Sequence, residues 1–305
     1  MRISVAFRFS ATLIVAAAVG AGLSGTAAAA TCSYSGAALE VTATLGPGES
    51  ATLAVAGSDI ELNGSSCGAA TNTNTDRILV SGPGGSTEHL IIDQFHGPLA
   101  PGATTPDNIE DPEIEVRVEL GDASDKVVVR GSPGEVPIAA GNGGVAFNDD
   151  HDVDITFSPL PNSIELVAAD GMPHILTARG GYGSGLVFPG PVTLRAGGLG
   201  DSLTGSNFAD LLVGDDGDDF IHGSDGLDVI DGGAGNDKLR GGDGNDSISG
   251  GPGADTLLGG YGDDIIDAND GEADLKIHGG PGIDTAAYDR GLDVPVACER
   301  LRPRG

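Results

Sequence analysis

The chain has 305 residues, of which 52 are Gly and 17 are Pro, and only 4% are aromatic. Gly and Pro are the poorest helix formers and bulky apolar side chains are scarce, so the composition argues against long helices and against one large conventional core. With 45 acidic and 15 basic residues, the formal net charge is -30. This charge excludes a nucleic-acid binder that relies on phosphate contacts, and it favours cations as ligands.

The first thirty residues have the pattern of a secretory signal peptide. Two arginines precede an apolar stretch over residues 11–23, and a run of small residues ends at Ala30. The three alanines at 28–30 predict cleavage there, so we expect a secreted, extracellular mature chain that begins at Thr31. An uncleaved membrane anchor is the alternative, which the shortness of the apolar stretch disfavours. We expect no membrane span in the mature chain.

Three cysteines follow the signal, at Cys32, Cys67 and Cys298. In an oxidising compartment, Cys32 and Cys67 are the natural pair for a disulfide, which would close the first segment of the mature chain. Cys298 has no obvious partner, and the spacing of the three residues fits neither a zinc site nor a redox motif.

The segment 31–196 contains short alternating apolar runs separated by Gly, Pro, Asn and Asp, which predict strands of four to seven residues. The clearest runs are residues 114–120, 126–130, 154–157 and 163–167. We interpret the segment as a degenerate β-solenoid that continues into the repeats described below. A separate small β-sandwich over 31–107, with the Pro-rich residues 97–106 as a linker or a long loop, is the alternative.

We find no catalytic constellation in this segment and expect a protein that is not an enzyme. Ser184 fails the nucleophile-elbow pattern because Tyr182 stands where Gly is needed. Glu88, His89 and His96 have the wrong order and spacing for a zinc-protease motif. The acidic run at 149–152 could bind a metal, but a solvated loop explains it better because sequential neighbours rarely converge on one ion.

A nine-residue period begins at Gly205 and holds over seven windows. Position one is Gly in all seven windows, and position four is Gly in six. Position eight is aliphatic in every window: Leu212, Ile221, Ile230, Leu239, Ile248, Leu257 and Ile266. Position six is Asp in every window: Asp210, Asp219, Asp228, Asp237, Asp246, Asp255 and Asp264. Three positions fixed in phase cannot result from composition alone.

Each of these positions has a physical role. Gly permits the positive φ of a tight turn and the close approach of neighbouring coils. The last three residues of each window form a short strand with one aliphatic side chain facing inward. One window cannot bury that side chain alone, so two windows form a coil of 18 residues and stacked coils form a continuous core. Strands of successive coils then lie about 4.8 Å apart.

Stacking places the Asp residues of alternate windows in two columns. Carboxylates repeated at strand spacing repel one another unless cations lie between them. Carboxylate and carbonyl oxygens suit Ca²⁺, whereas Mg²⁺ demands rigid octahedral geometry and releases water reluctantly. Further acids in the same turns add to the local field and are additional candidate ligands: Asp216, Asp218, Asp225, Asp243 and Asp263.

The array closely resembles the RTX, or haemolysin-type, calcium-binding nonapeptide repeat. The resemblance implies an all-β chain with a parallel β-roll, in which Ca²⁺ ions lie in the turns and the column Asp residues are ligands, at roughly five sites. A last match at 279–287 adds Asp284, and an incomplete repeat before Gly205 makes Asp201 a weaker candidate. The register breaks over 268–278.

The tail is similar to the closing segment of secreted actinobacterial calcium-binding proteins. In those proteins a Cys that pairs with the Cys near the end often stands where this chain has His278, which argues against such a pair for Cys298. We divide the chain into a signal peptide (1–30), a β-rich segment (31–196), a calcium-binding β-roll (197–287) and a C-terminal tail (288–305).

The sequence thus predicts a secreted, non-enzymatic calcium-binding protein whose repeats fold when they bind Ca²⁺. One alternative is a surface adhesin or matrix component that uses the β-roll as a spacer and has a cell-surface or polysaccharide partner. A secreted hydrolase with an active site in 31–196 is the remaining alternative.

Overall fold

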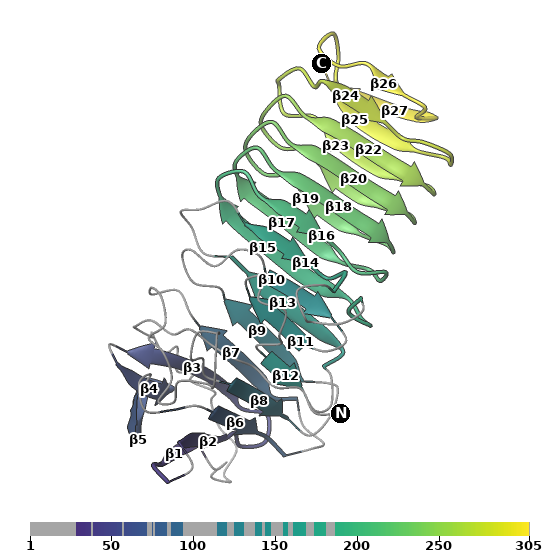
Figure 1. Ribbon diagram of the computed structural model, residues 1–305. Coiled ribbons are helices and arrows are strands. Elements are labelled where there is room, and N and C mark those ends of the chain that lie inside the picture. Colours follow the sequence, from purple (N-terminus) through teal and green to yellow (C-terminus); the bar gives the residue numbers. More distant parts are fainter. Residues whose placement is uncertain are drawn as a thin grey trace, which may run out of the picture. The chain divides into compact units, whose positions relative to one another are not determined.

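The structure of the chain is a computed structural model. It describes residues 29–37, 39–56, 58–71, 75, 77–83, 87–93, 115–120, 125–130, 138–141, 144–147, 155–157, 161–168, 174–180 and 187–304. These residues form 27 strands and no helix (Figure 1), so none of their segments is a helix able to cross a membrane. Nearly all of the expected signal peptide, the Pro-rich run 97–106, the acidic run 149–152 and Ser184 lie outside the described residues.

The chain divides into two compact units, and the first comprises residues 1–135, 142–164 and 181–185. Its strands are β1 (Thr31–Ser35), β2 (Glu40–Thr44), β3 (Ser50–Ala56), β4 (Asp59–Leu62), β5 (Ser65–Thr71), β6 (Arg77–Ser81), β7 (His89–Asp93), β8 (Glu115–Glu119), β9 (Lys126–Arg130), β11 (Gly144–Phe147) and β12 (Ile155–Phe157). Strands β2, β6, β8 and β12 pair in parallel, as do β3, β7 and β9. Strands β1, β4, β5 and β11 add antiparallel pairs.

The parallel ladders of the first unit agree with a degenerate solenoid. They continue past residue 107 into β8, β9 and β12, which a separate β-sandwich over 31–107 does not account for. Most of the ladder strands bury two alternate apolar side chains, as in Leu90 and Ile92 of β7 or Val127 and Val129 of β9. This period of two is the reason that the sequence folds here as half-buried strands.

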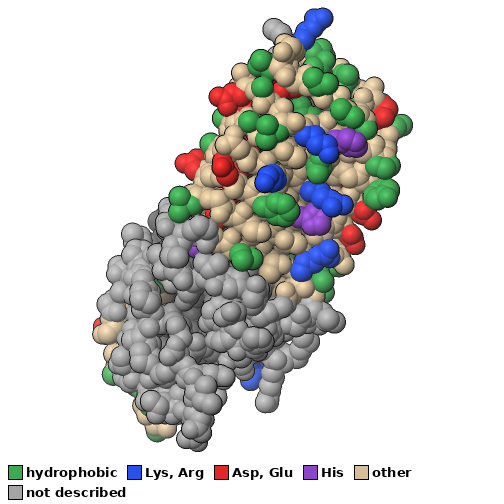
Figure 2. Space-filling view, turned by 45° about the horizontal axis from the view of Figure 1, so that its top comes forward, with side chains coloured by type: hydrophobic (Ala, Val, Ile, Leu, Met, Phe, Trp, Pro, Cys, Tyr) green, Lys and Arg blue, Asp and Glu red, His purple; other side chains and the backbone are tan. Residues whose placement is uncertain are grey.

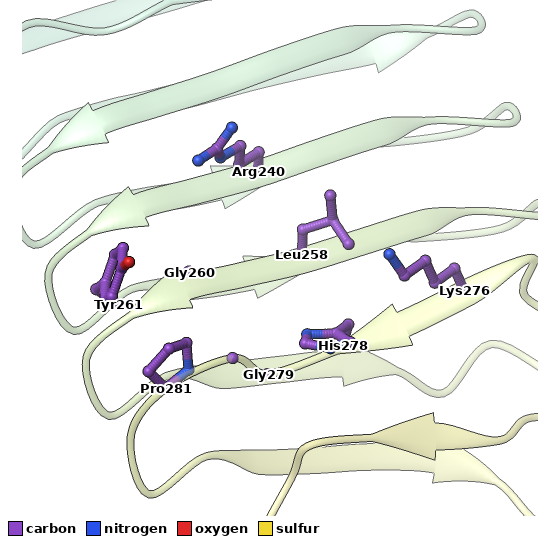
Figure 3. A pocket seen from close by; sticks show the side chains of 9 residues that line it. Arg240, Leu258, Gly260, Tyr261, Lys276, His278, Gly279 and Pro281 are labelled. Carbon is purple, nitrogen blue, oxygen red and sulfur yellow. The ribbon is translucent and has the colours of Figure 1, made fainter.

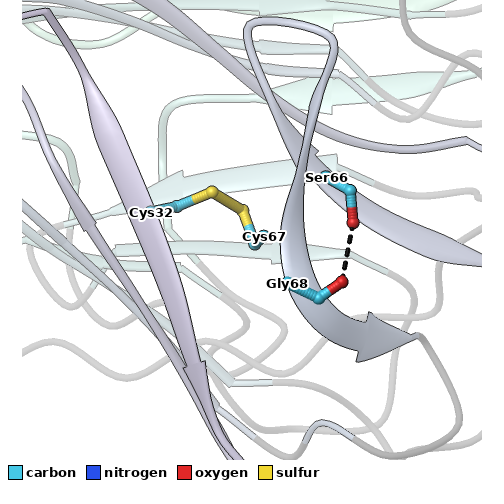
Figure 4. The surroundings of a disulfide bond; sticks show 4 residues. All are labelled: Cys32, Ser66, Cys67 and Gly68. Carbon is cyan, nitrogen blue, oxygen red and sulfur yellow. Dashed lines mark hydrogen bonds between the residues drawn. A yellow bond between two sulfur atoms is a disulfide. The ribbon is translucent and has the colours of Figure 1, made fainter.

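A disulfide joins Cys32 of β1 to Cys67 of β5 (Figure 4), with 5.1 Å between the Cα atoms and a sequence separation of 35. Beside it, the Ser66 hydroxyl donates to the Gly68 carbonyl at 2.9 Å. Cys67 is fully buried. The disulfide therefore links β1 to β5, the edge strand of the sheet that contains β3, β7 and β9.

The second unit comprises residues 136–141, 165–180 and 186–305. One of its sheets contains β10 (Ile138–Gly141), β14 (Ile175–Thr177), β16 (Ser202–Thr204), β18 (Phe220–Asp225), β20 (Lys238–Asp243), β22 (Thr256–Tyr261), β24 (Lys276–His278) and β26 (Pro295–Val296). The other contains most of β13 (Ser163–Val167), then β15 (Val192–Gly198), β17 (Leu211–Asp216), β19 (Val229–Asp231), β21 (Ser247–Ser249), β23 (Ile265–Ala268), β25 (Thr285–Asp289) and β27 (Arg300–Arg304). We call the first the front sheet and the second the back sheet.

The strands of the repeats pair in parallel with a shift of 18 residues, as the nonapeptide period predicts. In the front sheet Ile221 pairs with Leu239, and in the back sheet Ile230 pairs with Ile248. All seven aliphatic residues of position eight are at most 1% exposed. The two columns of aliphatic side chains, one from each sheet, therefore form the core of the β-roll.

The coils stack so closely that position four has no room for a side chain. Gly244 has a φ of +142°, and a Cβ atom built on it would lie 1.5 Å from the carbonyl oxygen of Gly226 in the preceding coil. Only Gly tolerates both this backbone conformation and this approach.

Candidate metal centre

The metal ligands expected from the sequence lie at the entrance to the strands, two residues before the inward aliphatic side chain. All of them are at most 3% exposed: Asp210, Asp219, Asp228, Asp237, Asp246, Asp255, Asp264 and Asp284. A buried carboxylate is costly unless it is hydrogen-bonded and paired with a cation. Eight of them in one small unit therefore require an explanation.

Each carboxylate is hydrogen-bonded to the backbone of the preceding coil through one of its oxygens. The N–H of Asp210 donates to Asp228 Oδ1 at 2.9 Å, and the N–H of Asp228 donates to Asp246 Oδ1 at 2.9 Å. The other column repeats this contact at 2.8 Å between Asp219 and Asp237. The two columns are thus ladders in which every Asp fixes the carboxylate of the next coil.

The second oxygen of most of these carboxylates is buried and, among the described residues, accepts no hydrogen bond. The Oδ2 atoms without a partner belong to Asp219, Asp228, Asp237, Asp246, Asp264 and Asp284. A buried acceptor without a partner carries the full cost of desolvation. These atoms are therefore the places where a positive partner would stabilise the fold most.

The unpartnered oxygens face a small niche beside the Gly of position one. A Cβ atom built on Gly223 would lie 2.2 Å from Asp228 Oδ2 and 2.6 Å from the carbonyl oxygen of Gly241. The niches beside Gly214 and Gly259 have the same two kinds of oxygen at 2.2–2.5 Å. The built Cβ lies too close to the Gly Cα to be an ion position, so these distances show only that a carboxylate oxygen and a carbonyl oxygen converge beside position one. Both are oxygen types that Ca²⁺ accepts as ligands.

The described residues contain no group of three or more His, Cys, Asp or Glu side chains that converge on one point. A cation in this niche would therefore take few carboxylates, and backbone carbonyls would complete its coordination. Such oxygen sets suit Ca²⁺ and disfavour softer metals that prefer imidazole or thiolate.

Burial shifts the protonation of the columns strongly. The pKa of Asp219 and of Asp228 is raised to about 7, mainly by burial and additionally by the neighbouring column carboxylates. Burial also raises the pKa of Asp237 and of Asp264 to about 6. The cause is that each negative charge lies in a poorly solvated place next to like charges, and a bound cation would remove this cost.

Three further members of the columns lie beyond the break in register and are not predicted by the nine-residue period. The N–H of Asp255 donates to Asp274 Oδ1 at 2.9 Å, and the N–H of Asp274 donates to Asp293 Oδ1 at 2.9 Å. In the other column the N–H of Asp284 donates to Glu299 Oε2 at 2.9 Å. Asp274 lies 19 residues after Asp255 instead of 18, so the nine-residue frame does not find it.

At the other end, Asp201 continues its column: its N–H donates to Asp219 Oδ1 at 2.6 Å. The N–H of the buried His174 in turn donates to Asp201 Oδ1. His174 therefore occupies the column position one coil before Asp201, where a further Asp would otherwise stand. The additional candidates Asp216, Asp218, Asp225, Asp243 and Asp263 are exposed, in contrast to the buried column residues. Cys298 forms no disulfide within the described residues.

Comparison with protein families identifies the repeats. Residues 204–239 and 240–272 match the family model described as the RTX calcium-binding nonapeptide repeat, which comprises four copies. The search of curated proteins and the search of solved structures found no match. The chain therefore carries RTX calcium-binding repeats in a parallel β-roll, and the first unit has no counterpart among these comparisons.

Proposed function

We propose that this chain, which carries RTX calcium-binding repeats over 204–272, is a secreted, non-enzymatic protein whose β-roll folds when Ca²⁺ enters the niches beside the Asp columns. The observation that carries the proposal is the set of buried Oδ2 atoms without a partner, each next to a carbonyl oxygen. The ligands would be the column residues Asp210, Asp219, Asp228, Asp237, Asp246, Asp255, Asp264 and Asp284, and backbone carbonyls would complete the coordination.

Folding and binding are coupled in this proposal because the columns exist only when the coils stack. Without a cation, stacking brings carboxylates together and buries them, which the charge of the unit opposes. With Ca²⁺, the free energy of ion binding becomes free energy of folding. An exported chain would thus stay unfolded in its repeats until it meets Ca²⁺ outside the cell.

Export has its own support. The first thirty residues have the composition of a cleavable signal, and the disulfide between Cys32 and Cys67 belongs to oxidising compartments. We expect the intact mass of the exported chain to correspond to a start at Thr31. A mass that retains residues 1–30 would contradict this part of the proposal.

The test of calcium-dependent folding is far-ultraviolet circular dichroism of the chain without residues 1–30, titrated with Ca²⁺ and, separately, with Mg²⁺. We expect a cooperative gain of β signal with Ca²⁺ and none at the same concentration of Mg²⁺. An unchanged spectrum with Ca²⁺, or the same gain with Mg²⁺, would contradict the proposal.

Asp246→Asn makes the test specific to the columns. Asn retains the oxygen that accepts the N–H of Asp228, but it removes a charge from the middle of the ladder. We expect the Ca²⁺ midpoint to rise about tenfold, because carboxylate charge sets affinity at such sites. Asp267→Asn is the matched control, since Asp267 is exposed on β23 of the back sheet; its midpoint should stay within about twofold.

A further inference from the structure

The outer face of the front sheet is basic, although the chain as a whole is strongly acidic. Figure 2 shows Lys, Arg and His side chains gathered on one face of the second unit. The basic residues of the strands β18, β20 and β24 are His222, Lys238, Arg240, Lys276 and His278. In the front-sheet strands β14, β16, β18, β20, β22 and β24, no described Asp or Glu occupies an outward position among the three residues that pair with both neighbouring strands. We call this surface the basic face.

The register of the sheet creates the basic face. His222 pairs with Arg240, then Leu258 and then His278 follow on the next two strands. In the parallel row beside it, Thr256 separates Lys238 from Lys276. An uncharged residue thus interrupts each row, which limits repulsion between like charges on adjacent strands.

The charges of the basic face are available to a ligand. Lys238, Arg240 and Lys276 are exposed, and none of them forms a salt bridge with a carboxylate within the described part of the chain. Burial lowers the pKa of His222, the positive charges of Arg240 and Arg179 lower it further, and Asp225 acts in the opposite direction. At His222 the two arginines therefore outweigh the nearby carboxylate.

A shallow hollow of about 290 Å³ lies at one end of the basic face. Arg240, Lys276 and His278 line it together with Leu258 and Tyr261 (Figure 3). The side chain of Tyr261 is 63% exposed.

The rim of the hollow departs from the pattern of the earlier coils. Strand pairing places Tyr261 in line with Asp243 and Asp225, so an aromatic ring replaces the carboxylate at this coil. Pro281 lines the hollow beyond Tyr261. The rim therefore loses negative charge and gains apolar surface beside the hollow that Arg240 and Lys276 line.

We propose that the basic face binds an anionic polysaccharide, a sugar chain that bears carboxylate or sulfate groups. Arg and Lys would pair with the anionic groups, and the planar guanidinium of Arg240 suits a two-oxygen contact. Tyr261, Pro281 and Leu258 offer apolar surfaces for the faces of sugar rings, as aromatic residues do at binding sites. Because basic residues lie on β18, β20 and β24, spread across several strands of the sheet, the surface suits a linear polymer.

This inference rests on the proposed function, since the face exists only when the coils are stacked. Cations in the niches would also neutralise the carboxylate columns of the same unit. Binding of the polymer should therefore require Ca²⁺ and weaken with added salt, because exposed charges are screened.

The test is binding of the chain without residues 1–30 to polygalacturonate and to dextran sulfate, at a fixed concentration of free Ca²⁺. Neutral dextran and double-stranded DNA are the comparison polymers. We expect binding to at least one of the two anionic sugars, and the stronger of them identifies carboxylate or sulfate as the group recognised. Equal retention of neutral dextran, or tighter binding of DNA, would overturn the proposal.

The variant Arg240→Gln/Lys276→Gln removes two charges from the hollow, and we expect it to bind the sugar about tenfold more weakly. Arg300→Gln/Arg302→Gln removes the same charge from the last strand of the back sheet, where both residues are exposed. This control should bind within about twofold of the unaltered chain. Equal binding by both variants would overturn the proposal.

Circular dichroism of each sample in Ca²⁺ separates the two proposals. If the unaltered chain gains no β signal with Ca²⁺, the proposed function fails and the basic face fails with it. If the chain folds with Ca²⁺ but retains neither anionic polymer, only the inference about the basic face is overturned.

Discussion

The two units of the chain are both built from parallel ladders, but they differ in what each strand buries. Strands β7 and β9 of the first unit each bury two β-branched or leucine side chains, whereas β19 and β21 of the repeats bury one isoleucine each. A fully buried side chain of this size contributes about 1.5–3 kcal/mol. Each strand of the repeats therefore gains about half as much free energy of folding from apolar burial as a strand of the first unit.

The two units also differ in how many buried carboxylates they contain. Glu88 accepts the N–H of Gly48 at 2.9 Å, and the N–H of Glu88 donates to Asp125 Oδ1 at 2.8 Å. Glu88 and Asp125 are the buried acids among the described residues of the first unit, and a disulfide reinforces the same unit. In the repeats, Gly-rich turns lose more backbone entropy on folding and the acids recur in every coil. Apolar burial and the disulfide therefore stabilise the first unit, whereas under the proposed function the second unit needs cations.

The largest effect that separates the units is expected from Gly244→Val. The Cβ would lie 1.5 Å from the carbonyl oxygen of Gly226, and Val is strained at a φ of +142°. The coils would have to separate, so we expect the repeats to lose more than about 4 kcal/mol of stability and their Ca²⁺-dependent β signal. Gly198→Val is the control, since nothing lies within 4 Å of a Cβ at that position. Normal Ca²⁺-dependent folding of Gly244→Val would show that close stacking is not required.

The sequence predicts the repeats well because one physical requirement recurs in every coil. The period places Ile221 and Ile230 in the core and Asp219 and Asp228 at the strand entrances, as the structure shows. In the first unit, the alternating run at 126–130 coincides with β9. The recognisable features are therefore those that repeat at a short, constant interval.

Residues that are brought together by loops of irregular length cannot be predicted from a constant period. Asp274 joins its column because the backbone N–H groups of Leu275 and Lys276 both donate to the Asp255 carbonyl, which absorbs one extra residue. Glu88 and Asp125 lie 37 residues apart, an interval that nothing in the local pattern marks. The basic face arises from outward positions that follow no period, so only the pairing of strands reveals it.

A second effect should act on the first unit alone. Cys32→Ser/Cys67→Ser opens a loop of 35 residues, and removal of a disulfide of this loop length costs about 2–4 kcal/mol. Thermal denaturation should show a lower midpoint for the Ca²⁺-independent transition, and the Ca²⁺ midpoint of the repeats should stay within about twofold. A comparable shift of both transitions would show that the two units do not differ in the way described.

The smallest effect is the pH dependence of the metal-free repeats. The folded-state pKa of Asp228 is about 7 and that of Asp237 about 6, against an ordinary value of 3.8. Because the folded state holds its protons more tightly, the stability that protonation provides is fully present below about pH 4 and is lost as pH rises through 6 to 7. In a chelator, the β signal of the repeats should therefore be larger at pH 5 than at pH 7.5. A signal that grows from pH 5 to pH 7.5 would contradict the burial of uncompensated carboxylates.

Hydrogen exchange of the full mature chain, with and without Ca²⁺, tests the central claim most directly, because it reports each unit separately. We predict that the backbone amides of 205–267 are protected only with Ca²⁺, whereas those of β2, β3, β6 and β7 are protected in both conditions. Protection of the repeats without Ca²⁺ at neutral pH, or loss of protection in both units when Ca²⁺ is removed, would contradict the account.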